Sequence, residues 1–308
     1  YEMLNDKVRT KAYQDAILNN KDLFKGKVVL DIGCGTGILS MFAAEAGAKL
    51  VIGIEMAHIY KIAQQNVKVN GFGDRIVILN GKVEEVVLPV EKVDIIISEW
   101  MGYFLFFEGM FDSVIWARDK YLVKGGMLFP NTSKVYMAAM VDHNFERNKR
   151  NSWENICGIQ VPELNFVHHL SSSVQVVSPD NVVSETEQIA FFNLETVSVA
   201  GLDFIHNFDL KIKRKEIVNS FVVWFDTDFS HGAEKVVLTT SPFQRYTHWK
   251  QGVINMRKQI PVESNDNVKG KIVVVKSSTN PRNLEIKTVI DFTNRKGHFT
   301  SEDFHSFS

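Results

Sequence analysis

Residues 27–39 of this 308-residue chain read KVVLDIGCGTGIL, and this stretch decides the fold. Its apolar beginning predicts a strand over residues 27–32, buried on both faces as in the middle of a parallel sheet. A glycine-rich turn follows, and residues 38–46 have the pattern of a helix. This layout is typical of a nucleotide-type cofactor site, because glycine lets a ligand approach backbone N–H groups closely. The GxGxG spacing disfavours a dinucleotide, whose usual motif is GxGxxG.

The strands predicted next carry acidic residues at or just beyond their carboxyl ends. Residues 49–55 form a second strand that ends in Glu55, where an acid can accept hydrogen bonds from ribose hydroxyls. Residues 75–79 and 93–98 form a third and a fourth strand. Ligands of open α/β sheets bind outside the carboxyl ends of the strands. Four residues are therefore expected on one rim of the sheet: Gly33, Glu55, Glu84 and Glu99.

Residues 98–108, SEWMGYFLFFE, form an almost wholly apolar loop with Glu99 and Glu108 near its ends. Such a loop packs against the protein, and a buried carboxylate needs a partner because an isolated buried charge is too costly. The loop contains no Arg or Lys, so the expected partner is a cation from outside. Two carboxylates suit a planar guanidinium best. Alternatively, Glu99 is solvated at a strand end and Glu108 favours the N-terminus of the next helix.

The periodicity of the sequence changes after Pro130. Before it, strands alternate with helices. From about Val174, alternating apolar and polar residues predict an antiparallel β region. Further predicted helices cover residues 2–19, 57–70 and 108–121. The chain is therefore predicted to contain two domains, at residues 1–130 and 131–308.

Composition and charge argue against several classes of protein. The net charge is −1, so nothing indicates bulk nucleic-acid binding or a charged membrane surface. Cys34 and Cys157 give no disulfide framework and fit a reducing compartment. His168 and His169 lack cysteine or acidic ligands at suitable spacing, so no metal site is expected. The first residue is neither an initiator Met nor the start of a signal peptide, which indicates a piece of a longer chain.

Four stretches resemble those of a known family. Residues 29–39 are similar to the S-adenosylmethionine motif of class I methyltransferases. Residues 98–108 resemble the double-E hairpin, and residues 247–251, THWKQ, the Thr-His-Trp loop, of the protein arginine N-methyltransferases. Residues 2–10 are similar to that family's segment before the sheet. The resemblance extends from residue 2 to about residue 292, and it points to the type I branch, which makes asymmetric dimethylarginine.

The resemblance implies how S-adenosylmethionine is held. Arg9 is expected to bind the cofactor carboxylate, Glu55 the ribose hydroxyls, and Glu84 with Val83 the adenine. The glycine turn would pass beneath the methionine and the ribose. The cofactor-binding residues implied in this way are Arg9, Asp31, Gly33, Gly35, Gly37, Glu55, Val83 and Glu84.

The resemblance also implies a substrate site. Glu99 and Glu108 are expected to clamp the substrate guanidinium, and His248, paired with Asp6, to border the pocket. Those four residues are the expected catalytic group. Four others are expected to line the pocket: Met3, Tyr103, Met110 and Trp249.

The expected products are monomethylarginine and then asymmetric dimethylarginine. The type I branch has methionines where Met3 and Met110 lie, and a flexible thioether can make room for a nitrogen that already carries a methyl group. From spacing alone, both would be core methionines. A catalytically weak or inactive partner subunit of the same fold is the alternative, but it would be expected to lose one clamp carboxylate. A small-molecule or nucleic-acid methyltransferase needs no paired acids, and the glycine spacing disfavours a nicotinamide dehydrogenase.

The family implies an α/β architecture in which a Rossmann-like S-adenosylmethionine-binding domain precedes a mainly antiparallel, β-barrel-like domain. It also implies a cis peptide before Pro130 and a helical dimerisation arm at about residues 142–170. The expected assembly is a homodimer that acts on Gly-Arg-rich proteins or histones in the nucleus and cytoplasm, without direct nucleic-acid or membrane partners. The family's upstream helix, with a Tyr-Phe-x-x-Tyr motif, does not occur in this sequence, so an incompletely closed pocket is expected.

Overall fold

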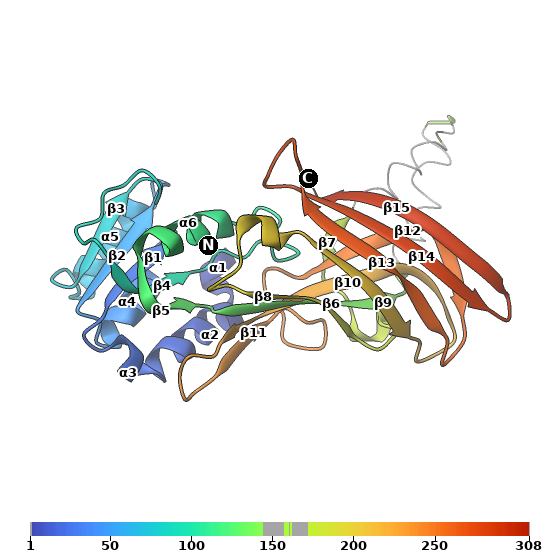
Figure 1. Cartoon of the computed structure of the whole chain (residues 1–308), viewed down its shortest axis with the longest axis horizontal. Coiled ribbons are helices and arrows are strands. Elements are labelled where there is room, and N and C mark those ends of the chain that lie inside the picture. The colour runs from blue at the N-terminus through green and yellow to red at the C-terminus, as the bar shows by residue number, and fades with distance from the viewer. Residues whose placement is uncertain (1, 144–156, 160, 162–171, 308) are drawn as a thin grey trace.

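The computed structural model describes residues 2–143, 157–159, 161 and 172–307. A helix-and-strand part, α1 to β5, lies beside a strand-rich part, β6 to β15 (Figure 1). No helix in the described residues is long and apolar enough to cross a membrane. The predicted arm at about residues 142–170 falls almost entirely outside the described residues.

The first part alternates strands with helices, as the apolar runs predict. Its elements are α1 (Glu2–Asn5), α2 (Lys7–Leu18), α3 (Lys21–Phe24), β1 (Val28–Ile32), α4 (Ile38–Glu45), β2 (Leu50–Glu55), α5 (Tyr60–Val69), β3 (Ile76–Asn80), β4 (Val93–Ser98), α6 (Phe111–Tyr121) and β5 (Leu122–Phe129). The five strands are parallel, in the order β3-β2-β1-β4-β5. The strand order reverses between β1 and β4, which is where ligands bind in open sheets of this kind. The predicted Rossmann-like fold is confirmed.

The helix predicted over residues 2–19 is divided at Asp6. This residue has an extended backbone (φ −71°, ψ 91°), and its Oδ1 accepts a hydrogen bond from Arg9 N–H at 2.9 Å. A carboxylate at this position satisfies one of the free N–H groups of the first helical turn. The chain therefore starts α2 afresh at Lys7, with Asp6 as its cap.

The second part is antiparallel, as predicted. Its elements are β6 (Thr132–Met140), β7 (Ser173–Gln175), η1 (Pro179–Asn181), β8 (Glu187–Asn193), η2 (Val199–Leu202), β9 (Phe204–Lys211), β10 (Glu216–Phe229), β11 (Val236–Thr239), β12 (Gln251–Val262), β13 (Asn267–Lys276), β14 (Leu284–Asn294) and β15 (Gly297–Phe307). One sheet has the order β7-β12-β10-β6-β8, with β11 paired to β10, and the other has the order β15-β14-β13-β9. The two sheets contact each other at β8 with β9 and at β12 with β15. Within the described residues no ladder joins the two sheets, so the barrel is not closed.

Aromatic side chains join the two parts where β5 ends. The peptide bond between Phe129 and Pro130 is cis, as the resemblance predicted. The ring of Phe129 packs on Phe24 from α3, with ring centroids 5.0 Å apart, and also contacts Phe229 from β10. Phe229 in turn packs on Tyr13 from α2 at 4.8 Å. One hydrophobic core therefore extends through both parts and fixes the strand ends of the parallel sheet against the second part.

Candidate active site

The glycine turn has the backbone conformation that its sequence predicts. Gly33, Gly35 and Gly37 all have positive φ, at 70°, 55° and 81°. A Cβ on Gly33 would lie 2.6 Å from Cε of Met110, the movable end of a flexible side chain, so the positive φ is the main reason for glycine at this position. Gly37 precedes the first residue of α4 and faces Ala63 rather than the cavity.

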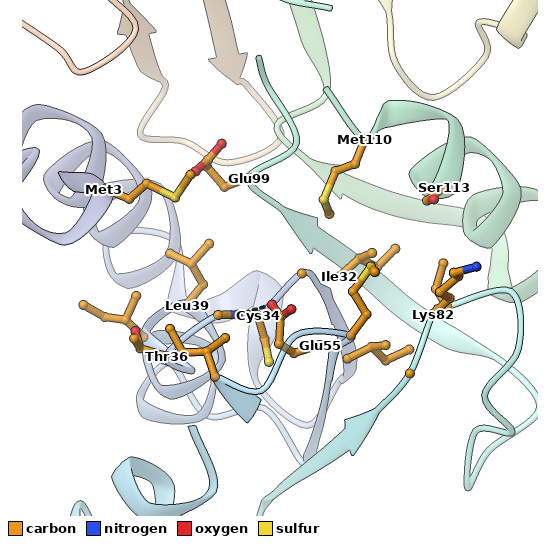
Figure 2. Close-up of a pocket in the computed structure, with 18 of the residues that line it drawn as sticks. Met3, Ile32, Cys34, Thr36, Leu39, Glu55, Lys82, Glu99, Met110 and Ser113 are labelled. Atoms are coloured by element: carbon orange, nitrogen blue, oxygen red, sulfur yellow. Dashed lines mark hydrogen bonds between the residues drawn. The ribbon is translucent and has the colours of Figure 1, made fainter. Parts of the chain in front are cut away.

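A cavity of about 790 Å³ opens above the glycine turn at the carboxyl ends of the strands. Figure 2 shows Met3 and Glu99 on one side of it, Met110 across from them, and Glu55 with Cys34 at its floor. Nine residues named from the sequence line this cavity: Met3, Arg9, Gly33, Gly35, Glu55, Val83, Glu84, Glu99 and Met110. The rim predicted from the parallel-sheet rule is therefore present.

Some lining residues were not predicted, among them Cys34, Ile59, Lys82 and Ser113. Cys34 and Lys82 lie within stretches already recognised, so their neighbourhood alone could have indicated them. Burial raises the pKa of the Cys34 thiol well above its ordinary value, so this side chain is a neutral part of the floor. Ile59 and Ser113 carry no signal in the sequence that distinguishes them from other helix residues.

Glu55 is fixed in place by the backbone of two turns. One carboxylate oxygen accepts a hydrogen bond from Gly35 N–H at 3.0 Å, and the other accepts one from Ala57 N–H at 2.8 Å. Each oxygen keeps a further lone pair, because an ionised carboxylate has about four acceptor sites. Glu55 can therefore hold the glycine turn and still accept from the hydroxyls of a ribose.

Asp31 does not lie where a direct cofactor contact would require. It is fully buried, and its Oδ2 accepts a hydrogen bond from Ser40 Oγ of α4 at 2.6 Å. Oδ1 has no partner among the described residues. Burial raises the pKa of Asp31 to about 6, against the influence of Ser40 and Arg9. Both faces of a central parallel strand are covered by helices, so the Asp31 side chain is buried whichever way it points. Its hydrogen bond with Ser40 connects β1 to α4.

Glu99 has a partner from within the protein, which corrects the expectation of a cation from outside. Arg9 Nη2 of α2 donates to Glu99 Oε2 at 3.1 Å, and both side chains are buried. Burial raises the pKa of Glu99, while Arg9 acts in the opposite direction. Arg9 Nε is buried and has no partner among the described residues. The guanidinium therefore keeps a donor for a second anion, such as the carboxylate of an amino-acid cofactor.

Asp6 and His248 are paired, as predicted. Asp6 Oδ2 accepts hydrogen bonds from the backbone N–H of His248 and lies against its Nδ1, both at 2.8 Å. Burial alone would raise the pKa of Asp6, but the hydrogen bonds from His248 and Arg9 outweigh burial and lower it. A carboxylate that stays ionised here fixes the orientation of the imidazole next to the cap of α2.

The loop after β4 holds its remaining candidates outside the cavity lining. Glu108 is exposed, and its carboxylate has no hydrogen bond or ion pair with another described residue. Tyr103 stacks on Phe107, with ring centroids 6.4 Å apart. Trp249 is buried under the loop, and its Nε1 donates to Met101 O at 3.0 Å. Trp249 was predicted to line the pocket. It instead supports the loop and is not among the residues that line the cavity.

Comparison with known proteins identifies the family. A family model described as the arginine methyltransferase oligomerization subdomain matches residues 131–295, and one described as ribosomal protein L11 methyltransferase matches residues 15–159. Protein arginine N-methyltransferase 1 of Dictyostelium discoideum is 44% identical over 291 residues, which cover 94% of this chain and 85% of that protein. The chain belongs to the protein arginine N-methyltransferases.

Other relatives agree with this identification. Protein arginine N-methyltransferase 1 of Saccharomyces cerevisiae is 45% identical, over 94% of this chain and 84% of that protein. A structure of the Trypanosoma brucei PRMT1 enzyme–prozyme heterotetrameric complex with AdoHcy contains a chain that is 37% identical. It superposes with a TM-score of 0.97, over 100% of this chain and 97% of that one. Arabidopsis thaliana protein arginine methyltransferase 10, in an open conformation, gives a TM-score of 0.91 at 30% identity, over 100% and 97% of the two chains.

The protein is thus an arginine methyltransferase, and S-adenosylmethionine is its methyl donor. The cavity fits this cofactor on its own chemistry. It offers the free donor of Arg9 for a carboxylate, the fixed acceptors of Glu55 for a ribose, and a close backbone approach at Gly33. Val83 and Glu84, to which the resemblance assigns the adenine, also line this cavity.

Proposed function

We propose that this arginine methyltransferase forms monomethylarginine first and asymmetric dimethylarginine on longer reaction. Support comes from Met3 and Met110, which line the same cavity as Glu99. Met110 lies directly against Gly33 of the cofactor turn. Their unbranched side chains can move aside for a nitrogen that already carries a methyl group. The same side chains hinder the rotation that would present the other nitrogen.

Glu99 in the cavity and Glu108 on the loop after β4 are proposed to overcome a specific chemical difficulty. A guanidinium is a poor nucleophile with a pKa above about 12, and it must approach a second cation. S-adenosylmethionine, when bound, supplies an electrophilic sulfonium methyl group. Glu99 and Glu108 are proposed to orient one guanidinium nitrogen and to draw positive charge onto the nitrogens that do not attack. Glu108 or the Asp6–His248 pair accepts the proton that is released.

Product analysis tests this assignment of the product. The protein, S-adenosylmethionine and a Gly-Arg-rich peptide are incubated, and samples taken over time are hydrolysed and separated by chromatography. Monomethylarginine is expected early and asymmetric dimethylarginine late, because the methionines leave one nitrogen accessible twice. Symmetric dimethylarginine as the main product would contradict the role of Met3 and Met110.

The proposed substrates are Gly-Arg-rich proteins or histones, and the proposed location is the nucleus and the cytoplasm. A buried acid beside an open cavity suits arginine residues in flexible segments, because such segments can reach a recessed site. Mass spectrometry of the peptide after incubation would show additions of about 14 and 28 Da per arginine, the masses of one and two methylene increments. Incorporation into nucleic acid instead would point to a different class of methyltransferase.

The proposed assembly is a homodimer. A subdomain described as responsible for oligomerization covers residues 131–295 of this chain, and a Trypanosoma brucei relative forms an enzyme–prozyme heterotetramer. A symmetric pair is the default for identical subunits. A catalytically weak partner subunit is the second candidate, but this chain has both Glu99 and Glu108.

Light scattering of the purified chain at micromolar concentration tests the assembly. A mass close to twice the 35.0 kDa of the chain is expected. Deletion of residues 142–170 should give monomers of low activity, because the proposed contact surface is removed. A monomeric mass for the intact chain would contradict the homodimer, whether or not the chain is active.

A further inference from the structure

We infer that the turn between β13 and β14, residues 277–283, positions Glu108 for substrate binding. This turn belongs to the far sheet of the second part, yet its backbone reaches the loop after β4. Glu108 N–H donates to Arg282 O at 2.8 Å, and Arg282 Nη2 donates back to Glu108 O at 3.4 Å. The inference rests on the proposed role of Glu108 as the second carboxylate of the clamp.

The backbone of Glu108 needs such support. Its φ is 56°, in the left-handed region that non-glycine residues rarely adopt and that costs about 1–2 kcal/mol. Phe104 and Leu105 share this conformation, with φ of 52° and 69°. A Cβ added to Gly102 would lie 1.7 Å from Phe107 O, so the loop is also tightly closed. Strained backbone persists only where the surroundings determine it, and at Glu108 the contacts from Arg282 do so.

The turn is held by backbone hydrogen bonds of its own and by the side chain of Asn280. Arg282 N–H donates to Asn280 Oδ1 at 3.1 Å, and Asn283 N–H donates to Asn280 O at 2.8 Å. Ser277 N–H donates to Asn283 O at 3.0 Å and closes the turn at its base. Asn280 therefore sets the direction in which the Arg282 carbonyl points.

Two further contacts hold the same sheet against the loop. Lys276, the last residue of β13, forms an ion pair with Asp112 in the first turn of α6. Phe307, at the end of β15, packs on Phe104 and Phe107, with ring centroids 5.5 and 5.6 Å apart. These contacts fix the sheet, and with it the turn, against the loop after β4. Arg282 is therefore a positioning residue that acts on the substrate by holding Glu108 in place.

Hydrogen exchange and steady-state kinetics of three variants test this inference. Asn280→Ala redirects the turn, Arg282→Ala removes the guanidinium contact, and Arg295→Ala is the matched control. Arg295 is an exposed arginine at the opposite end of β14, without a hydrogen bond or ion pair to another described residue. Each variant is also examined for its melting temperature and for its affinity for S-adenosylmethionine.

Asn280→Ala should raise the exchange rate of the Glu108 amide, because it redirects the Arg282 carbonyl that accepts from this amide. Both variants should raise the KM for an arginine peptide. Each change should be about fivefold, the effect of one lost hydrogen bond. Cofactor affinity and melting temperature should stay unchanged, and Arg282→Lys should restore part of the peptide KM. The Arg295→Ala control should have the same Glu108 exchange rate and the same peptide KM as the parent. Unchanged exchange in Asn280→Ala, together with an unchanged KM in both variants, would overturn the inference. Full activity of Glu108→Gln would instead refute the clamp itself, so the two failures are distinguishable.

Discussion

Glu108→Gln is expected to lower turnover roughly 100-fold or more, the scale seen when one preorganised electrostatic contact to a transition state is lost. Glu99→Gln is expected to have a similar effect. Each substitution keeps the size of the side chain and removes the negative charge that offsets the repulsion between the guanidinium and the cofactor. The affinity for S-adenosylmethionine should be retained, which calorimetry can measure alongside a peptide methylation assay.

The two variants should differ in stability. Glu99 is buried against Arg9, so its neutralisation leaves a buried cation with a weaker partner and lowers the melting temperature. Glu108 is exposed, so Glu108→Gln should leave the melting temperature unchanged. Glu45→Gln, an exposed acid at the end of α4, is the matched control for charge. Near-parental turnover of Glu108→Gln at normal stability would remove this residue from the mechanism.

Glu55→Ala is expected to weaken S-adenosylmethionine binding by about 1.5–3 kcal/mol, the scale of hydrogen bonds to a charged group, or about 10- to 100-fold in affinity. The loss has two sources. The ribose loses its acceptors, and the N–H groups of Gly35 and Ala57 lose the carboxylate that fixes them. Calorimetry with S-adenosylmethionine measures the effect directly.

A graded series separates these sources. Glu55→Gln keeps one side-chain oxygen that can accept from one backbone N–H. Its affinity for S-adenosylmethionine should lie between those of the parent and the alanine variant. Glu45→Ala, an acid in the same part of the chain that lies outside the cavity lining, should bind as the parent does. Equal affinity of the parent and Glu55→Ala would show that the ribose is held elsewhere.

The rim of the site could be predicted from the sequence because it depends on local rules. Gly33, Glu55 and Glu99 each follow or end a strand, and parallel strands open at one edge. The Asp6–His248 pair could not be found by such rules, because its members are 242 residues apart and only the family resemblance brings them together. Local sequence can place a residue on an element, whereas the partner of that residue depends on the packing of distant elements.

The errors have the same physical origin. The sequence of the loop shows that it lacks a cation, but not that Arg9, 90 residues earlier, lies within 3.1 Å of Glu99. Asp31 lies in a strand that is buried on both sides, so its position along the strand does not tell which way its side chain points. Trp249 belongs to the Thr-His-Trp motif, yet its indole points under the loop after β4 toward Met101.

The shared carboxylate of Asp6 has a consequence for how the protein is made. It begins α2 near the N-terminus, but it also holds His248 across a separation of 242 residues, so this bond closes one of the longest loops in the molecule. Contacts of such high sequence separation form late in folding, since the entropy of loop closure must be overcome first. During synthesis the parallel sheet can therefore assemble while the ribosome is still translating the second half. The Asp6–His248 pair can form only after the chain has been synthesised past His248.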